Sequence, residues 1–389
     1  MRTQVGIVGA GPAGLTLARL LELAGIESVV LENRSREYCE RRVRAGVLEQ
    51  GTVDLLREAG VAERLEQEGI VHGGIYLQFE GERHHVPLAE LTGRTIVIYG
   101  QTEVVKDLIA ARVASGLPLL FEADVSGVAD VESERPRVRF TYQGREQELE
   151  CDVVAGCDGF HGVCRSAIPA GVLRTFERDY PFGWLGILAE VEPSADELVY
   201  AYNERGFALL SLRSARLSRY YVQVRHDEDP ADWPDDRIWK ELRLRTELDG
   251  WTLEPGPVLE KGVTGMRSFV TEPMQYGRLF LAGDAAHIVP PTGAKGLNLA
   301  VSDVRILARR LVDWQGTGDG AALEGYSEEC LGRVWRAEHF SWWMTSMLHV
   351  AEDGDPFDRR LQLAQLRYVT SSRPAAASLA ENYVGLTTL

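Results

Sequence analysis

The chain has 389 residues, 45% of them hydrophobic and 26% charged, which is typical of a folded protein with two or three domains. A formal net charge of −16 argues against nucleic acid or an anionic membrane surface as a partner, because both carry negative charge. The five cysteines include no Cys-x-x-Cys pair, so we expect no metal site. There is no secretory leader pattern and no apolar run of about 18 residues, which predicts a cytoplasmic location.

The amino-terminal pattern predicts a strand at 5–8, a helix at 12–24 and a second strand at 29–32. The turn between the first strand and the helix reads Gly9-Ala10-Gly11-Pro12-Ala13-Gly14. This order of elements around a Gly-rich turn favours a dinucleotide site, whereas the glycines alone would also fit a simple packing turn. Glu32 ends the second strand, where its carboxylate is placed to accept hydrogen bonds from a ribose.

The three glycines of this turn have different tasks in such a site. Gly9 permits the tight turn, Gly11 lets the backbone approach a pyrophosphate, and Gly14 lets the helix pack closely on the strand. The pyrophosphate then lies at the amino end of the helix, where free N–H groups and the helix dipole favour an anion.

The rest of the chain alternates between strands and helices. We expect short strands over 75–99, a β-rich stretch over 180–263 and a mostly helical region from 321 onwards. The other predicted helices cover 52–59, 101–115, 235–246 and 297–314, and further strands cover 138–142 and 148–155.

A second informative segment, from Gly283 to Asn298, follows the apolar run 279–282. Asp284 comes directly after that predicted strand, where a carboxylate can hold the ribityl side of FAD, although a plain helix cap is the alternative. The residues from Gly293 begin the long helix, whose first N–H groups can face the pyrimidine edge of a flavin. Together with the Gly-rich turn, this segment predicts an α/β protein with a Rossmann-like FAD-binding domain.

Several motifs resemble those of the single-component, class A FAD-dependent aromatic monooxygenases. The Gly-rich turn, the Asp158-Gly159 turn and the Gly283-Asp284 loop are similar to the three signatures of that family. Similarity to the branch that acts on 4-hydroxybenzoate extends over about residues 3–386, most clearly at 43–51, 180–186, 285–298 and 381–385. The resemblance implies a homodimer with a discontinuous FAD-binding domain at 1–71, 100–179 and 266–345, a β-rich substrate domain at 72–99 and 180–265, and a C-terminal helical segment at 346–389.

A hairpin is predicted from the alternating strands 208–213 and 219–224, joined by five residues. With 213 opposite 219, residue 211 lies opposite 221, so one face carries Ser211, Arg213, Arg219 and Tyr221. This is either a solvated polar face or an anion pocket in which Arg213 binds a carboxylate through two N–H groups. The resemblance implies the pocket, with Ser211, Arg213, Tyr221 and Pro291 binding an aromatic acid and Arg219 supporting the flavin.

The reaction implied by the resemblance is hydroxylation of 4-hydroxybenzoate to 3,4-dihydroxybenzoate by O2, through a flavin C4a-hydroperoxide. Electrophilic attack needs a phenolate, whereas a phenol with a pKa of about 10 is neutral at working pH. The resemblance implies that Tyr200, Tyr383 and His72 form the proton path, with His72 at its solvent end because only His72 titrates near neutrality. Read without the resemblance, they would be core aromatics and a structural histidine.

A hydride donor must bind transiently, because the sequence has no second Gly-rich nucleotide fold. Asn33, Glu37 and Glu40 slightly favour NADH, whereas Arg34 and Arg42 fit the 2′-phosphate of NADPH, and a solvated helix face is the alternative. The resemblance assigns NAD(P)H binding to Arg34, Tyr38, Arg44, Phe160, His161 and Arg267, and further cofactor contacts to Arg42, Arg44, Gln101, Asp158, Gly293, Leu297 and Asn298.

Two other functions remain open from the sequence. One is a related FAD hydroxylase for another phenolic acid, of the 3-hydroxybenzoate or salicylate type. The other is a non-catalytic FAD-fold scaffold, against which the intact segment from Gly283 to Asn298 argues.

Overall fold

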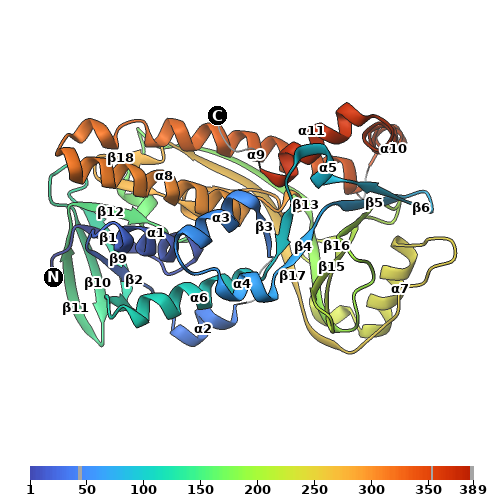
Figure 1. Cartoon of the computed structure of the whole chain (residues 1–389), viewed down its shortest axis with the longest axis horizontal. Helices are drawn as coiled ribbons and strands as arrows, with labels where there is room; N and C mark the ends of the chain where they lie inside the picture. Colours follow the sequence, from blue (N-terminus) through green and yellow to red (C-terminus); the bar gives the residue numbers. More distant parts are fainter. Residues whose placement is uncertain (43–45, 352–353, 386–389) are drawn as a thin grey trace.

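The computed structural model describes residues 1–42, 46–351 and 354–385, which form one sheet of six strands, one of eight and two of three. The six-stranded sheet and its helices lie at one end of the molecule and the eight-stranded sheet at the other (Figure 1). Within the three described stretches, no helix has both the length and the apolar character that crossing a bilayer requires.

The centre of the six-stranded sheet is β1 (Val5–Val8), which pairs in parallel with β2 (Ser28–Leu31) and β12 (Val153–Gly156). All residues of these strands are buried, as in a parallel sheet covered on both faces. Helix α1 (Pro12–Leu23) follows β1, and the predicted strand, turn, helix and strand are thereby confirmed. α1 packs against α6 (Gln101–Ala114) and α8 (Gly296–Thr317), and the outer strands are β8 (Leu119–Leu120), β19 (Leu279–Leu281) and β18 (Gln275–Tyr276).

The prediction of one strand at 148–155 is wrong, because the chain changes sheets in its middle. The N–H of Cys151 still donates to the carbonyl of Pro136, next to the partner of the preceding strand, whereas the N–H of Asp152 donates to the carbonyl of Gln4, next to β1. That preceding strand lies in a separate antiparallel sheet, whose members are β9 (Asp124–Ala129), β10 (Arg137–Tyr142) and β11 (Arg145–Glu150).

The eight-stranded sheet is built on two long antiparallel strands, β13 (Arg174–Glu190) and β17 (Val258–Glu272). The predicted domain limits 179/180 and 265/266 fall inside these two strands, so the division into domains stays a prediction. The sheet continues through β16 (Leu217–Arg225), β15 (Ala208–Ser214), β14 (Val199–Ala201), β5 (Ile75–Phe79) and β6 (Glu82–Val86), with β20 (His287–Ile288) beside β17 and helix α7 (Asp235–Arg245) following β16 in the chain.

The predicted pairing of the β15–β16 hairpin is wrong by two residues. Ser211 lies opposite Arg219, and Leu209 opposite Tyr221, because the turn is tighter than expected and the register shifts between Leu212 and Ser214. A shift of two residues preserves the faces, so Ser211, Arg219 and Tyr221 still share one.

Three helices complete the C-terminal part and bring it back beside the eight-stranded sheet (Figure 1). They are α9 (Tyr326–Leu348), α10 (Pro356–Ser371) and α11 (Arg373–Val384). The smaller elements are α2 (Arg36–Arg41), β3 (Val47–Glu49), α3 (Gln50–Glu58), α4 (Glu63–Glu68), β4 (Ile70–His72), α5 (Leu88–Thr92), β7 (Ile96–Ile98) and the 3-10 turns η1 (Cys164–Ala167), η2 (Pro230–Asp232), η3 (Gly283–Ala285), η4 (Pro291–Gly293) and η5 (Gly320–Leu323).

Candidate active site

The Gly-rich turn between β1 and α1 has the geometry of a phosphate cradle. Gly9 has φ +103°, and a Cβ there would lie 2.3 Å from the carbonyl oxygen of Cys157. A Cβ on Gly14 would lie 2.0 Å from the carbonyl oxygen of Gly9. Gly11, in contrast, has no atom within 4 Å of where its Cβ would be, and it begins α1 without a capping side chain. The turn therefore leaves open space at a helix amino end, which fits a pyrophosphate.

Glu32 is held beside this turn. Its carboxylate accepts hydrogen bonds from the backbone N–H groups of Ala10 (2.7 Å) and Arg34 (2.8 Å). The two donors fix the carboxylate at the carboxyl end of β2, where the predicted ribose contact would be made.

The loop at Gly283 is held by a buried pair, Asp303 and His287, which the sequence analysis missed. Asp303 Oδ2 on α8 accepts from the N–H of Gly283 (3.0 Å) and lies 2.6 Å from Nε2 of His287. Burial lowers the pKa of His287, but the Asp303 carboxylate outweighs burial and raises that pKa above its ordinary value. Asp284 is exposed between buried neighbours, so the loop presents its side chain outwards as the FAD prediction requires.

Both the oxygen and the nitrogen of the Asn298 side-chain amide are hydrogen-bonded to other parts of the protein. Its Oδ1 accepts from Glu49 N (2.9 Å) and Thr52 Oγ1 (2.7 Å), and its Nδ2 donates to the carbonyls of Val47 (3.0 Å) and Ala294 (2.9 Å). This leaves the backbone of the residue, and not its side chain, for the predicted cofactor contact.

The other predicted residues of this loop have varied surroundings. Pro291 and Leu297 are half-buried. Gly293 packs on α9, since a Cβ there would lie 2.7 Å from Oγ of Ser341.

A second buried pair, Glu49 and Lys295, was also missed. Lys295 Nζ donates to Oε1 of Glu49 (2.6 Å) and to the carbonyl of Tyr383 (2.8 Å). Burial lowers the pKa of Lys295, although the Glu49 carboxylate opposes that shift. Both residues lie in segments that carried the family resemblance, which was the available signal.

The two predicted catalytic tyrosines meet, although they are 183 positions apart. The hydroxyls of Tyr200 on β14 and Tyr383 on α11 lie 2.6 Å apart, and both side chains are 1% exposed. Burial raises the pKa of each phenol.

The expected position of His72 at the solvent end of a proton path is wrong. Its side chain on β4 is 0% exposed, and burial lowers its pKa. Neither ring nitrogen has a hydrogen-bond partner within the part of the chain that the structure describes. A path from the tyrosines to His72 would therefore need atoms other than those two hydroxyls.

The hairpin face brings the predicted carboxylate-binding residues to the same sheet as Tyr200. Arg213 is half-buried beside the turn; burial lowers its pKa, and the neighbouring Tyr221 opposes that shift. The guanidinium of Arg219 lies 5.4 Å from the centre of the Tyr221 ring. A Cβ on Gly186 would lie 2.8 Å from Nη2 of Arg219. Gly186 thus makes room for Arg219.

The residues assigned to NAD(P)H form two groups. The guanidinium of Arg267 lies 4.7 Å from the Phe160 ring, which meets the His161 ring edge-on at 4.9 Å. Arg34 lies 5.2 Å from the Tyr38 ring at the start of α2. Of the remaining predicted cofactor residues, Arg42 is exposed and Gln101 begins α6. The carboxylate of Asp158 accepts a hydrogen bond from the N–H of Cys164 (2.8 Å), and its buried Oδ1 has no partner within the described stretches. Arg44 lies outside the described residues.

The Gly-rich cradle, the fixed Glu32 and the anchored loop before α8 define the class of protein as an FAD-binding enzyme. In agreement, residues 2–341 match the family model described as FAD binding domain. The p-hydroxybenzoate hydroxylase of Acinetobacter baylyi is 50% identical over 99% of this chain and 96% of its own length. The chain therefore belongs to the FAD-dependent aromatic hydroxylase family.

More distant relatives mark the limits of the likeness. Rifampicin monooxygenase of Streptomyces venezuelae is 27% identical over 85% of this chain and 67% of its own. The crystal structure of p-nitrophenol 4-monooxygenase from Pseudomonas putida has a TM-score of 0.85 at 18% identity, with all of both chains covered, which shows a common fold. Dialkyldecalin synthase of Streptomyces rugosporus, 27% identical over 85% of this chain and 69% of its own, carries the name of a different reaction, so the substrate must be argued from the site.

Proposed function

We propose that the chain hydroxylates 4-hydroxybenzoate at the carbon beside its hydroxyl, using FAD, O2 and NADH or NADPH, and forms 3,4-dihydroxybenzoate and water. The observation that carries the proposal is a row across three strands. Tyr200 pairs with Leu209, and Leu209 pairs with Tyr221. Directly opposed residues share a face, so the two tyrosines project from one face of the sheet, two strand spacings or about 10 Å apart.

This spacing suits a para-substituted ring. In 4-hydroxybenzoate, the carboxylate and the hydroxyl lie at opposite ends, so one can approach Tyr221 while the other approaches Tyr200. Salicylate has both groups at one end and cannot engage both tyrosines. A 3-hydroxy acid directs its hydroxyl away from the axis that joins them.

The carboxylate end is assigned to the hairpin. Arg213 presents a planar guanidinium that binds a carboxylate through two parallel N–H bonds, and the hydroxyls of Ser211 and Tyr221 add donors. Pro291, on the loop before α8, borders the aromatic ring. Because Arg213 is already half-buried, a bound carboxylate offsets part of the cost of desolvating its charge.

The hydroxyl end is assigned to the buried tyrosine pair. The substrate hydroxyl gives its proton to the oxygen of Tyr200 while Tyr200 passes its own proton to Tyr383 across the 2.6 Å hydrogen bond and Tyr383 releases its own proton to the next group of the path. Tyr200 then donates to the substrate oxygen and stabilises it as a phenolate. Lowering a phenol pKa of about 10 by two units requires about 2.7 kcal/mol of preference for the anion. His72 stays in the proposal as a buried member of this path, reached from the tyrosines through atoms other than their two hydroxyls.

The cofactor roles follow the geometry of the turn and loop. Gly9, Gly11, Gly14 and Glu32 bind the ADP half of FAD, while Asp284 and the start of α8 hold the ribityl and ring portions. When bound and reduced, FAD supplies the two electrons and activates O2, of which one atom enters the ring and the other leaves as water. Phe160, His161 and Arg267 receive the nicotinamide nucleotide, with Arg34 and Tyr38 near its adenosine end.

We also propose that the enzyme is a cytoplasmic homodimer. Phe176, Trp335 and Trp342 are each about 40% exposed around a hollow of about 300 Å³ between β13, β17 and α9. Exposed aromatic clusters of this kind are frequent in subunit interfaces. Sedimentation of the purified protein at micromolar concentration should give twice the mass of one chain.

The experiment that tests the function compares two substrates in two proteins. Wild-type enzyme with FAD should convert 4-hydroxybenzoate to 3,4-dihydroxybenzoate, identified by chromatography, with NADH or NADPH consumed. Arg213→Ala should raise the Kd for 4-hydroxybenzoate by roughly tenfold to a hundredfold, the worth of a lost charged hydrogen-bond pair. The Kd for 4-hydroxybenzamide, which carries no anion, should change much less. Equal losses for the two ligands, or a different product, would contradict the assignment.

A further inference from the structure

The carboxyl end of α9 connects two parts of the proposed site. Thr345 lies in its last turn, and Oγ1 of Thr345 forms a 2.9 Å hydrogen bond with Oγ1 of Thr292, the residue after Pro291. The backbone carbonyl of Thr345 accepts a 3.1 Å hydrogen bond from Nδ1 of His349. One residue of α9 therefore contacts both the loop before α8 and the segment that follows α9.

His349 continues this connection to the eight-stranded sheet. Nε1 of Trp184 donates to Nε2 of His349 (2.7 Å), which requires a neutral ring with its proton on Nδ1. Burial lowers the pKa of His349 to about 3, so the ring stays neutral at working pH. The Trp184 ring in turn lies 4.9 Å from the ring of Tyr221. An unbroken series of contacts thus runs from the half-buried Tyr221 through buried side chains to Thr292.

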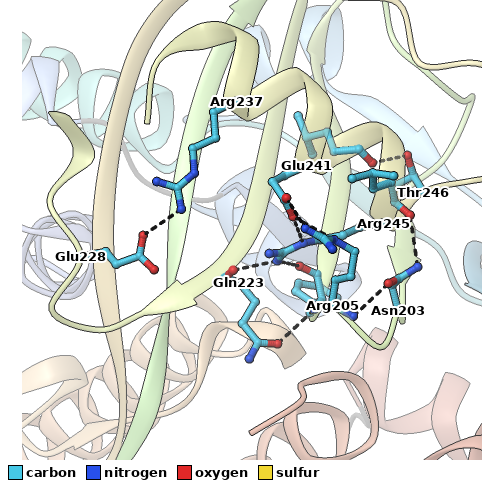
Figure 2. A network of polar contacts seen from close by, with 11 residues as sticks. Asn203, Arg205, Gln223, Glu228, Arg237, Glu241, Arg245 and Thr246 are labelled. Atoms are coloured by element: carbon cyan, nitrogen blue, oxygen red, sulfur yellow. Dashed lines mark hydrogen bonds and ion pairs between the residues drawn. The ribbon is translucent and has the colours of Figure 1, made fainter. Parts of the chain in front are cut away.

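The segment containing His349 is held by a second set of bonds. Gln223 Oε1 accepts from the N–H of Val350 (3.1 Å) and of Phe207 (3.0 Å), and its Nε2 donates to the carbonyl of Val350. Arg245 of α7 donates to the backbone carbonyl of Gln223 (2.7 Å), within the polar network of Figure 2. The backbone of Val350 is thus bonded to Gln223 of β16. These bonds hold the neighbouring His349 against Trp184.

We propose that Trp184, His349 and Thr345 are positioning residues that couple the hairpin carrying Tyr221 to the loop at Thr292. The inference rests on the proposed function, in which the hairpin binds the substrate carboxylate and the loop borders the flavin. A carboxylate that fixes Tyr221 also fixes Trp184, because their rings are in contact. The three hydrogen bonds carry that constraint to Thr292, since densely packed interiors transmit displacement rather than absorb it.

The test measures the ratio of NAD(P)H oxidation rates with and without 4-hydroxybenzoate in the FAD-loaded enzyme. Thr345→Val keeps the shape and the carbonyl of the residue but removes the hydrogen bond to Thr292. We expect the ratio to fall about fivefold or more, the usual lower range of coupling between two sites. The Kd for 4-hydroxybenzoate, read from the flavin absorbance, should change less than the ratio, whereas a general structural defect would move both.

Thr370→Val is the matched control for this substitution. Oγ1 of Thr370 bonds to carbonyls of Leu366 and Arg367 within its own helix α10. The same change of atoms there should leave the ratio at the wild-type value. A drop equal to that of Thr345→Val would contradict the proposal.

Substitutions of His349 and Trp184 test the same series of contacts with a second set of variants. His349→Gln keeps an uncharged acceptor for Trp184 and should retain most of the ratio, whereas His349→Leu should lose it. Trp184→Phe combined with Thr345→Val should reduce the ratio no further than the larger single effect, because both break one series of contacts. An unchanged ratio in FAD-saturated Thr345→Val and His349→Leu would overturn the inference. A wild-type enzyme whose NAD(P)H oxidation is not stimulated by 4-hydroxybenzoate would also overturn the inference. The proposed function fails separately, if the wild-type enzyme forms no 3,4-dihydroxybenzoate.

Discussion

Tyr200 and Tyr383 share a hydrogen bond in a place that bulk water does not reach, and this determines what their hydroxyls can do. Burial raises the pKa of both phenols, so each is protonated at neutral pH. Neither can release a proton to solvent directly. A proton arriving from a substrate at Tyr200 must therefore be exchanged along the bond to Tyr383.

Tyr200→Phe should remove this exchange while keeping the ring and the packing. We expect hydroxylation to fall by about a hundredfold or more, the usual worth of a positioned acid or base, with little change in the Kd of FAD or 4-hydroxybenzoate. The measurement is product formed per NAD(P)H consumed. Tyr202→Phe is the matched control, because the buried hydroxyl of Tyr202 has no hydrogen-bond partner within the described stretches. Near-normal product from Tyr200→Phe would exclude the tyrosine path.

At the scale of elements, the sequence predicted most reliably what depends on neighbouring residues. The buried runs of β1 and β2, the helical spacing of α1 and the β15–β16 pair all follow from local periodicity. The register of the β15–β16 pair does not follow from local periodicity, because it depends on how many residues form the turn. A single strand at 148–155 was expected because periodicity does not reveal that the chain changes sheets after Cys151.

Contacts between distant parts of the chain were beyond local patterns. The ion pair of Glu49 and Lys295 joins residues 246 positions apart, and the burial of His72 depends on elements packed around β4. The resemblance brought Tyr200 and Tyr383 into one hypothesis before any geometry was known. It could not reveal that the side chain of Asn298 is fully used by the scaffold.

Substitutions in the Gly-rich turn test whether its glycines allow α1 to pack closely on β1. Gly14→Ala places a Cβ 2.0 Å from the Gly9 carbonyl, and relief requires α1 to move from β1. We expect a loss of about 1–3 kcal/mol in the free energy of unfolding of the FAD-free protein, which exceeds the gain of under about 1 kcal/mol from placing alanine in a helix.

Gly11→Ala is the counterpart in the same turn. Its Cβ would meet no atom within 4 Å, so the FAD-free protein should unfold at the wild-type denaturant concentration. The methyl group would occupy the space assigned to the pyrophosphate, and the Kd for FAD should rise at least tenfold. Equal stability losses in the two variants, or unchanged FAD affinity in Gly11→Ala, would contradict this assignment of the cradle.

For the whole molecule, the site depends on chain segments that lie far apart in sequence. α1, which follows the Gly-rich turn, packs on α8, which follows the Gly283 loop, and α11 returns Tyr383 to both Tyr200 and Lys295. No single segment contains the site, so the site can form only when these parts fold together.

A ligand that spans these segments should therefore stabilise the entire fold. FAD binds the folded chain and not the unfolded one, so free FAD at 100 times its Kd should add about 2.7 kcal/mol to the free energy of unfolding. The FAD-free protein, prepared by removing the cofactor under mild conditions, should show one thermal transition that moves to higher temperature as FAD is added. Riboflavin, which lacks the pyrophosphate and the adenosine, should shift it far less at the same concentration. A shift of equal size with riboflavin would mean that the Gly-rich turn contributes nothing to binding, and two separate transitions would mean that the segments fold without one another.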